Sequence, residues 1–305
     1  MSAEVAEARR RFRQSLFEAG LLFDTGVPGV VGSSGRFESI MSALQAHITR
    51  AAQSDCAELR RFPAVMSRAV FKATGHIENF PQLCGSVHSF FGGDAEHMTL
   101  LDRVAKDEDW GASLQQTNVM MTPSACYPLY PTLKGRLPEG GRTFEITGDC
   151  FRHEPSEDPA RFQAFRMREQ VRLADESTVR AWRSSWMERG HALLQALGLE
   201  VTLEVANDPF FGRGGRLMRA NQAAQELKFE LMVSVTSSDA PTAVGSFNYH
   251  QEHFGHLFGI EDHKGATAHS ACLGFGLERV VLALLSAHGL DSDAWTKAVR
   301  KELWP

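Results

Sequence analysis

TFEITGDCFRHEPSEDPARFQAFRMREQVRL, residues 143–173, is the stretch that decides the fold. It predicts two long strands, 143–154 and 161–173, joined by a turn at 155–159 that contains two prolines. Because side chains alternate along a strand, Arg152 and Glu154 share one face, and Phe165 and Glu169 share one face of the return strand. Burying these groups together is costly unless they bind a charged or aromatic partner such as a nucleotide. The alternative is an exposed hairpin whose charges pair in solvent.

The regions on either side of this strand pair also alternate between strand and helix patterns. Helical spacing predicts helices at 37–52, 179–197 and 277–287, and we expect a short charged helix over 1–25 followed by a Gly-rich loop at 26–35. Further strands are expected at 201–206, 227–236, 242–250 and 271–274, with a helix ending near 225. Long strands with helices interspersed indicate an α+β fold around a mainly antiparallel sheet.

Composition narrows the class of protein. The chain has 305 residues, 43% of them hydrophobic, which is enough for one large catalytic domain with small appendages. The sequence contains no run of 18 apolar residues, which a transmembrane helix would need. The charged N-terminus also lacks the apolar stretch of a secretory signal, so we expect a cytoplasmic location. Five cysteines without a CxxC pair argue against a disulfide framework. The formal net charge of −5 makes a nucleic-acid partner less favoured.

Three further motifs could take part in chemistry. GFGLER, residues 274–279, places Arg279 in the first turn of an apolar helix, where a bound anion would explain a cation. FGRGGRLMR, residues 211–219, is either a phosphate-binding loop or a flexible loop with solvated arginines. The histidines between 250 and 269 are spaced three residues apart in places, but their surroundings indicate irregular structure rather than a metal site.

The order of these motifs resembles the class II aminoacyl-tRNA synthetases. That class is recognised by a strand with FRxE, a loop, RxxxF on the next strand, and a C-terminal GxGxxR helix, which match 151–154, 161–165 and 274–279 here. The resemblance implies an antiparallel β-sheet flanked by helices. It also places a first motif at 62–66, which in this class packs a homodimer.

Within that class the seryl-tRNA synthetases are most similar. PSACYPL, residues 123–129, resembles their Pro-Thr-Ala-Glu-Val-Pro-Leu segment, with Cys126 in place of the acid. This replacement points to the archaeal zinc-dependent branch, and the resemblance implies one Zn²⁺ per subunit held by Cys126, Glu169 and Cys272. Three protein ligands leave a fourth position for the α-amino group of a free amino acid.

The N-terminal region helps to decide whether the activated amino acid is transferred to a tRNA or to a carrier protein. We expect 1–60 to be a short helical and loop region without a tRNA-binding domain, and 61–305 to be the catalytic domain. Truncated homologues of this kind are the amino acid:[carrier protein] ligases, and the segments 79–85 and 246–250 also fit that family. The resemblance implies activation of glycine or alanine with ATP and Mg²⁺, followed by transfer to the phosphopantetheine thiol of a small acidic carrier protein.

The resemblance also implies roles for individual residues. Arg152 would bind the α-phosphate and the amino-acid carboxylate, Phe165 would stack on adenine, and Arg279 would hold the γ-phosphate. The remaining assignments are Glu154 and Arg161 to ATP, Glu230 and Ser246 to Mg²⁺ and the phosphates, Asn248 to the amino-acid pocket, and Arg213, Arg216 and Arg219 to carrier docking. The acid that the class carries just before Ser246 is absent, so the sequence does not identify the Mg²⁺ ligands.

Two alternatives stay open. One is a compact synthetase that charges tRNA, and the other is a non-catalytic paralogue that binds amino acids. The choice between glycine and alanine is also open, because one methyl group is worth only about 1–3 kcal/mol of discrimination.

Overall fold

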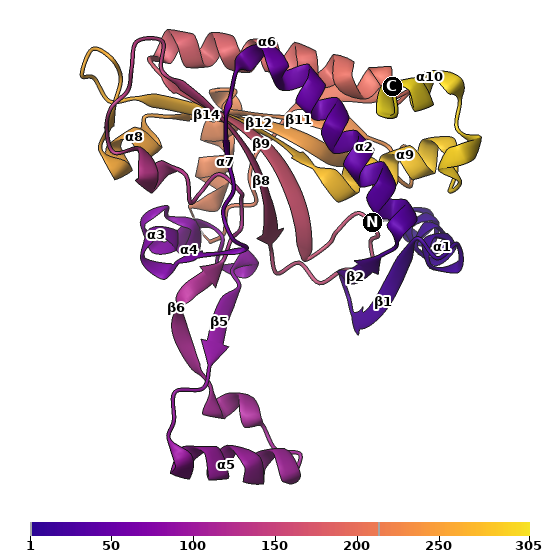
Figure 1. Cartoon of the computed structure of the whole chain (residues 1–305), viewed down its shortest axis with the longest axis vertical. Coiled ribbons are helices and arrows are strands. Elements are labelled where there is room, and N and C mark those ends of the chain that lie inside the picture. Colours follow the sequence, from indigo (N-terminus) through magenta and orange to yellow (C-terminus); the bar gives the residue numbers. More distant parts are fainter. Residues whose placement is uncertain (1, 213) are drawn as a thin grey trace.

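The computed structural model describes residues 2–212 and 214–305 (Figure 1). Its centre is a seven-stranded sheet in the order β10-β11-β12-β14-β9-β8-β3, in which only the β3–β8 pair is parallel. The strands are β3 (Glu58–Arg60), β8 (Arg142–Phe151), β9 (Ala164–Ala174), β10 (Val201–Val205), β11 (Lys228–Val233), β12 (Thr242–Gln251) and β14 (His269–Gly276). The prediction of an α+β fold around an antiparallel sheet is confirmed.

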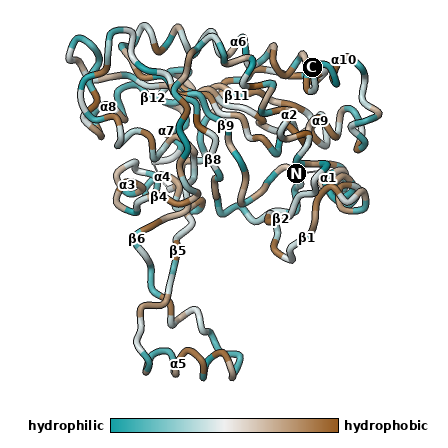
Figure 2. The backbone as a smooth tube through the Cα atoms, viewed as in Figure 1, coloured by the Kyte–Doolittle hydropathy of each residue, from teal (hydrophilic) through white to brown (hydrophobic). Residues whose placement is uncertain are grey.

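Long helices cover one face of this sheet. They are α2 (Gly35–Ala52), α6 (Glu176–Ala196) and α9 (Leu277–His288), with α10 (Lys297–Leu303) beside α2. Each of the first two begins at a side-chain cap, because Ser34 accepts from the Phe37 amide and Asp175 accepts from the Thr178 amide. Helix α9 is apolar on nearly all sides and almost entirely buried, and Figure 2 shows hydrophobic segments along it on the side of the body where α10 lies.

The N-terminal segment differs from the expectation. Helix α1 spans Ala3–Glu18 and stops well before residue 25, and β1 (Leu22–Val27) with β2 (Val30–Ser33) forms a hairpin where a Gly-rich loop was expected. Gly26 and Gly29 adopt φ of +82° and +79° in its turn, a conformation that suits glycine. Leu16, Phe37 and Ile40 belong to the same hydrophobic cluster as α9. Residues on both sides of position 60 therefore share one hydrophobic core. The division into an N-terminal region, 1–60, and a catalytic domain, 61–305, stays a prediction.

The loop between β8 and β9 is longer than the sequence indicated. β8 ends at Phe151 and β9 begins at Ala164, so Arg152, Glu154 and Arg161 lie in the connecting loop instead of within strands. β14 is longer than the expected 271–274 at both ends. This matters for the site, because loop side chains need not alternate between faces.

The other elements are short and lie around the sheet. They are α3 (Arg68–Ala73), α4 (His76–Asn79), α7 (Gly215–Ala224), α8 (His253–Phe258), β7 (Gly135–Arg136) and β13 (Ile260–Glu261). A three-stranded sheet of β4 (Val65–Ser67), β6 (Gln115–Met121) and β5 (Ser86–Ser89) extends away from the body and ends in α5 (Asp94–Ala105) (Figure 1). We call residues 86–121 the arm. No helix among the described residues is long and apolar enough to cross a membrane.

Candidate active site

A pocket of about 840 Å³ opens on the sheet face opposite α6 and α9, lined by β9, β11, β12 and β14 and by the loop 123–129. Strand register builds its floor. Ser246 lies opposite Glu230 on one side and Gly274 on the other, and Gly274 lies opposite Glu169. Two residues along, Asn248 lies between Lys228 and Cys272. Residues two apart share a face, so both rows point into the pocket.

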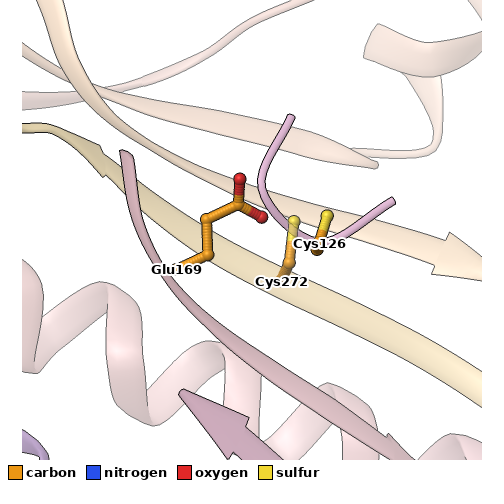
Figure 3. A group of neighbouring side chains, drawn as sticks. All are labelled: Cys126, Glu169 and Cys272. Carbon is orange, nitrogen blue, oxygen red and sulfur yellow. The ribbon is translucent and has the colours of Figure 1, made fainter. Parts of the chain in front are cut away.

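Cys126, Glu169 and Cys272 converge at one end of the pocket. Their ligand atoms all lie within 4.8 Å of one another, and Figure 3 shows the three side chains directed at a common point. All three are buried, and they come from the loop 123–129, β9 and β14. The structure thus brings together the residues that the sequence resemblance selected as zinc ligands.

The electrostatics of this group suit a cation. Glu169 Oε1 accepts hydrogen bonds from Ser124 Oγ (3.1 Å) and from the Ala125 amide (2.8 Å), while the buried Oε2 has no hydrogen-bond partner. Burial and the neighbouring Cys272 raise the pKa of Glu169 to about 7. Hydrogen bonding from Cys126 lowers the pKa of Cys272 well below its usual value, which favours a thiolate. Two sulfur donors and a carboxylate with one oxygen lacking a partner are a donor set that fits Zn²⁺.

Two arginines, Arg152 and Arg279, also line the pocket. Arg152 Nε donates to the Pro123 carbonyl (3.0 Å), and its guanidinium lies 5.3 Å from the centre of the Phe165 ring. Arg279 donates to the carbonyls of Ala160 (2.9 Å) and Ala243 (3.0 Å). Burial, with the charge of Arg152, lowers the pKa of Arg279 to about 10. Neither arginine pairs with a carboxylate among the described residues, so the pocket around them suits an anion.

Comparison with known proteins gives the family. No protein-family model matches the chain. The chain is 41% identical over 282 residues to an amino acid–[acyl-carrier-protein] ligase of Bradyrhizobium diazoefficiens, a match that covers 92% of this chain and 86% of the relative. The chain belongs to the amino acid–[acyl-carrier-protein] ligase family.

More distant relatives agree with this placement. A type-2 serine–tRNA ligase of Methanopyrus kandleri is 26% identical over 203 residues, covering 62% of this chain and 38% of the relative. The seryl-tRNA synthetase of M. kandleri, solved with a tRNA of Aquifex aeolicus, superimposes with a TM-score of 0.79 at 20% identity, covering 99% of this chain and 60% of that one. That likeness shows that the ligase has the class II synthetase fold.

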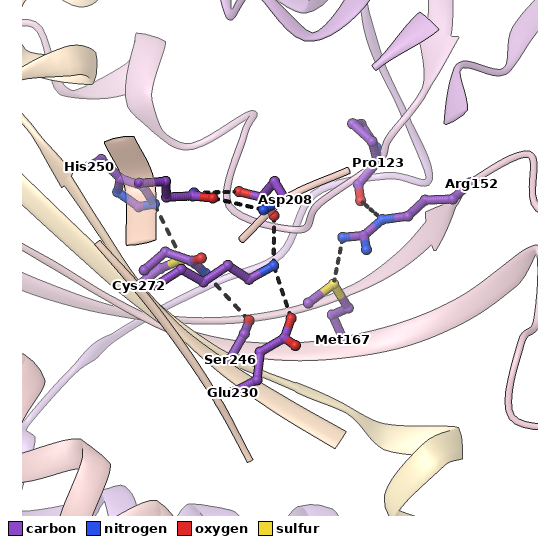
Figure 4. Close-up of polar contacts among 11 residues, drawn as sticks. Pro123, Arg152, Met167, Asp208, Glu230, Ser246, His250 and Cys272 are labelled. Atoms are coloured by element: carbon purple, nitrogen blue, oxygen red, sulfur yellow. Dashed lines mark hydrogen bonds and ion pairs between the residues drawn. The ribbon is translucent and has the colours of Figure 1, made fainter. Parts of the chain in front are cut away.

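Sequence reasoning about this ligase missed a charged network on the pocket floor. The Lys228 ammonium is buried between Asp208 (2.6 Å) and Glu230 (2.9 Å), and Asp208 also accepts from Gln222 of α7 (2.8 Å) (Figure 4). Burial acts against the charged lysine, but the two carboxylates outweigh it and raise the pKa of Lys228. Glu230 therefore already has a cationic partner. The only sequence signal was a lysine within the apolar strand LKFELMV.

The remaining predicted residues are distributed unevenly around the ligase pocket. Asn248 donates to Ser246 Oγ (3.3 Å) and to Cys272 Sγ (3.5 Å), which places it beside the Cys–Glu–Cys group. Glu154 pairs with Arg161 at the rim (3.1 Å). Of the three docking candidates, Arg216 is exposed on α7, Arg219 donates to the Phe210 carbonyl (2.7 Å), and Arg213 lies outside the described residues.

The histidine-rich stretch does not form a metal group of its own among the described residues. His250 instead lies beside Cys272, with Nε2 3.5 Å from Sγ and Nδ1 3.1 Å from Ser270 Oγ. This position supports the Cys272 thiolate, since His250 is among the groups that lower the pKa of Cys272.

Proposed function

We propose that this chain activates a small amino acid, glycine or alanine, with ATP and transfers it to the phosphopantetheine thiol of a small acidic carrier protein. The observation that carries the proposal is one pocket that is lined both by a metal-binding group and by two arginines, neither of which pairs with a carboxylate among the described residues. An amino acid held by the metal-binding group would direct its carboxylate to a nucleotide held by the arginines.

The amino-acid site would hold one Zn²⁺ through Cys126, Glu169 and Cys272. A zinc ion held by these residues would supply a Lewis acid to which the neutral α-amino group of the substrate could bind. Asn248 lies against Cys272 and would line the pocket for the substrate side chain. Lys228, fixed by two carboxylates, lies opposite Asn248 in the strand register and forms part of the same floor.

The nucleotide site would act by positioning and charge. The amino-acid carboxylate oxygen attacks the α-phosphorus, the bond to the bridging oxygen breaks, and pyrophosphate leaves with the electron pair. Arg152 would hold the α-phosphate and the carboxylate, Phe165 would stack on adenine, and Arg279 would hold the γ-phosphate. Glu154 and Arg161 would bind ATP at the rim, and Ser246 with Glu230 would face the phosphates and their Mg²⁺.

Transfer would follow at the same carbonyl. The carrier thiolate forms a thioester bond and AMP leaves, so no nucleophile from this chain is needed. Helix α7 lies over the pocket, with Met218 and Gln222 among its lining, and would receive the carrier through the exposed Arg216 and through Arg219, with Arg213, which precedes the helix in sequence, as the third docking candidate. An acidic partner and a basic helix would be electrostatically complementary.

The test is amino-acid-dependent pyrophosphate exchange, followed by thioester formation on a carrier with its phosphopantetheine attached. We expect exchange with glycine or alanine, loss of exchange after chelation, and recovery with Zn²⁺. Cys126→Ser should lose bound zinc and exchange together, whereas the matched thiol substitution Cys56→Ser, at an exposed cysteine, should keep both. Absence of exchange with every amino acid would instead support a non-catalytic binding protein.

A further inference from the structure

The loop between β8 and β9, residues 152–163, lies against the N-terminal segment of the chain. Arg152, Glu154 and Arg161, which we assigned to ATP, all lie in this loop. The N-terminal unit, by which we mean α1, β1 and β2 (residues 2–33), contacts it at several points, and Figure 1 shows the β1–β2 hairpin beside it. The reaction proposed above assigns no role to this unit.

Arg9 of α1 begins a chain of contacts that ends at Arg279. The Arg9 guanidinium pairs with Asp158 Oδ2 (3.0 Å), and the two side chains are only 19% and 6% exposed. Asp158 Oδ1 accepts from the Ala160 amide (3.0 Å), and the Ala160 carbonyl accepts from Arg279 Nε (2.9 Å). All four residues line the same pocket. Arg279 is therefore oriented by a loop that Arg9 holds in place.

A second set of contacts joins the N-terminal unit to Arg152. Gln163 donates from its backbone amide to the Gly29 carbonyl (2.7 Å) and from its side chain to the Pro28 carbonyl (2.8 Å). The Gln163 carbonyl in turn accepts from the Arg152 amide (2.8 Å). The approach is close, because a Cβ atom at Gly29 would lie 3.0 Å from the Arg161 carbonyl oxygen. Each arginine that we assigned to the phosphates is thus connected to the N-terminal unit through this loop.

Charge explains why the contacts from α1 matter. The loop carries Glu157 and Asp158 beside a pocket that we assign to a polyphosphate, and a carboxylate without a cation would repel such a ligand. Arg9 pairs with Asp158, and Arg13 pairs with Glu157 (2.5 Å). Arg161 Nε reaches the same Asp158 oxygen only at 3.8 Å. Without Arg9, the buried Asp158 carboxylate would draw Arg161 away from the rim, and the loop would lose its fixed position.

We propose that the N-terminal unit positions the ATP-binding loop, and that Arg9 is a positioning residue that acts on Arg279 through Asp158. A loop that is already fixed loses less conformational freedom when ATP binds, so the nucleotide binds more tightly. The inference rests on the proposed ATP site, but it concerns a segment outside the motifs that indicated that site.

The test is the dissociation constant of Mg²⁺–ATP from the full chain, measured by calorimetry without amino acid, together with the KM values in pyrophosphate exchange. Arg9→Ala should raise the dissociation constant and the KM for ATP roughly 10-fold, while the KM for the amino acid and the zinc content stay unchanged. Arg9→Lys keeps a cation for Asp158 and should recover most of the loss. Arg10→Ala is the matched control on the same helix, since Arg10 is exposed and pairs with Glu7, and it should bind ATP as the wild type does.

A double-mutant cycle tests whether Arg9 acts through Asp158. In an Asp158→Asn background, Arg9→Ala should change the ATP dissociation constant less than about twofold. An effect as large as in the wild-type background would mean that Arg9 binds the phosphates directly, and it would overturn the positioning role. Equal ATP affinities of Arg9→Ala and Arg10→Ala would also overturn it.

The dissociation constants separate this inference from the proposed function. A wild-type chain that binds ATP but shows no exchange with any amino acid would contradict the proposed function alone, because the effect of Arg9→Ala on ATP binding would still be measured. A wild-type chain that does not bind ATP would overturn both.

Discussion

Gly274 lies in the pocket floor, opposite Ser246 on one neighbouring strand and Glu169 on the other. The packing around it leaves no space for a side chain. A Cβ atom at this position would lie 2.9 Å from Met167 Cε and 3.2 Å from Glu169 Cγ. Gly274→Ala should therefore displace the Glu169 carboxylate and weaken zinc binding roughly 10- to 100-fold, the range seen when groups that orient metal ligands are lost. Zinc titration against a competing chelator measures this.

Gly276 provides the control for that substitution. It lies two residues along the same strand, and a Cβ there would have its nearest contact at 3.7 Å, on the flexible Arg279 side chain. Gly276→Ala should keep the zinc affinity of the wild type. Equal affinities in the two alanine variants would mean that Gly274 does not position the ligand.

His76 gives a prediction about pH. It is 5% exposed, and neither ring nitrogen has a hydrogen-bond partner. Burial, with the nearby Arg152 and despite Asp208, lowers the pKa of His76 to about 4. The unfolded chain thus binds more protons between pH 6.5 and 4, so the free energy of unfolding should fall by about 3 kcal/mol through this window as pH decreases, and no contribution is lost above 6.5.

Substituting His76 isolates this contribution from those of other histidines. His76 packs against the rings of Phe71, Phe80 and Tyr127, so His76→Phe keeps an aromatic ring in the same place. Urea unfolding from pH 7 to 4 should show a flatter acid limb in the variant than in the wild type. Parallel curves would show that His76 titrates normally.

At the scale of residues, local rules predicted only what lies within one strand. Alternation is enough to place Phe165 and Glu169 on one face of β9, but Cys126 and Cys272 come from distant segments and were selected by resemblance alone. Asp208 could not be predicted, because it lies in a loop whose path depends on packing against α7. From the sequence alone its partner Lys228 would be assigned to the surface, because the carboxylate that pairs with it comes from that loop.

At the scale of elements, strands with clear alternation were predictable and the arm was not. In the stretches 143–154 and 161–173 the side chains alternate with the period of a strand that has one face buried in a sheet. The arm instead presents its apolar residues to solvent, so its pattern does not indicate a buried face. The loop 152–163 was assigned partly to strands for a related reason. Its chain direction is set by contacts such as that of the Gln163 amide to the Gly29 carbonyl, which lie far away in sequence.

The proposed role of helix α7 in carrier docking can be tested separately from amino-acid activation. Arg216 is exposed and does not line the pocket, so Arg216→Glu should raise the KM for the carrier roughly fivefold while pyrophosphate exchange is unchanged. Lys301→Glu on α10 changes the net charge equally at an exposed position and should leave transfer unaffected. An unchanged KM in Arg216→Glu would remove α7 from the docking surface.

At the scale of the whole molecule, the net charge of the chain favours a carrier protein over tRNA as the acceptor of the amino acid. The chain has a formal charge of −5, and tRNA binding draws most of its affinity from phosphate contacts that release counterions. We therefore expect no charging of total tRNA under conditions that load the carrier, and no inhibition of carrier loading by tRNA at physiological salt. A radiolabelled amino acid followed into both acceptors in one reaction measures this. Charging of tRNA with a steep decrease as salt rises would favour the compact synthetase, because it would require a basic surface that the overall charge does not indicate.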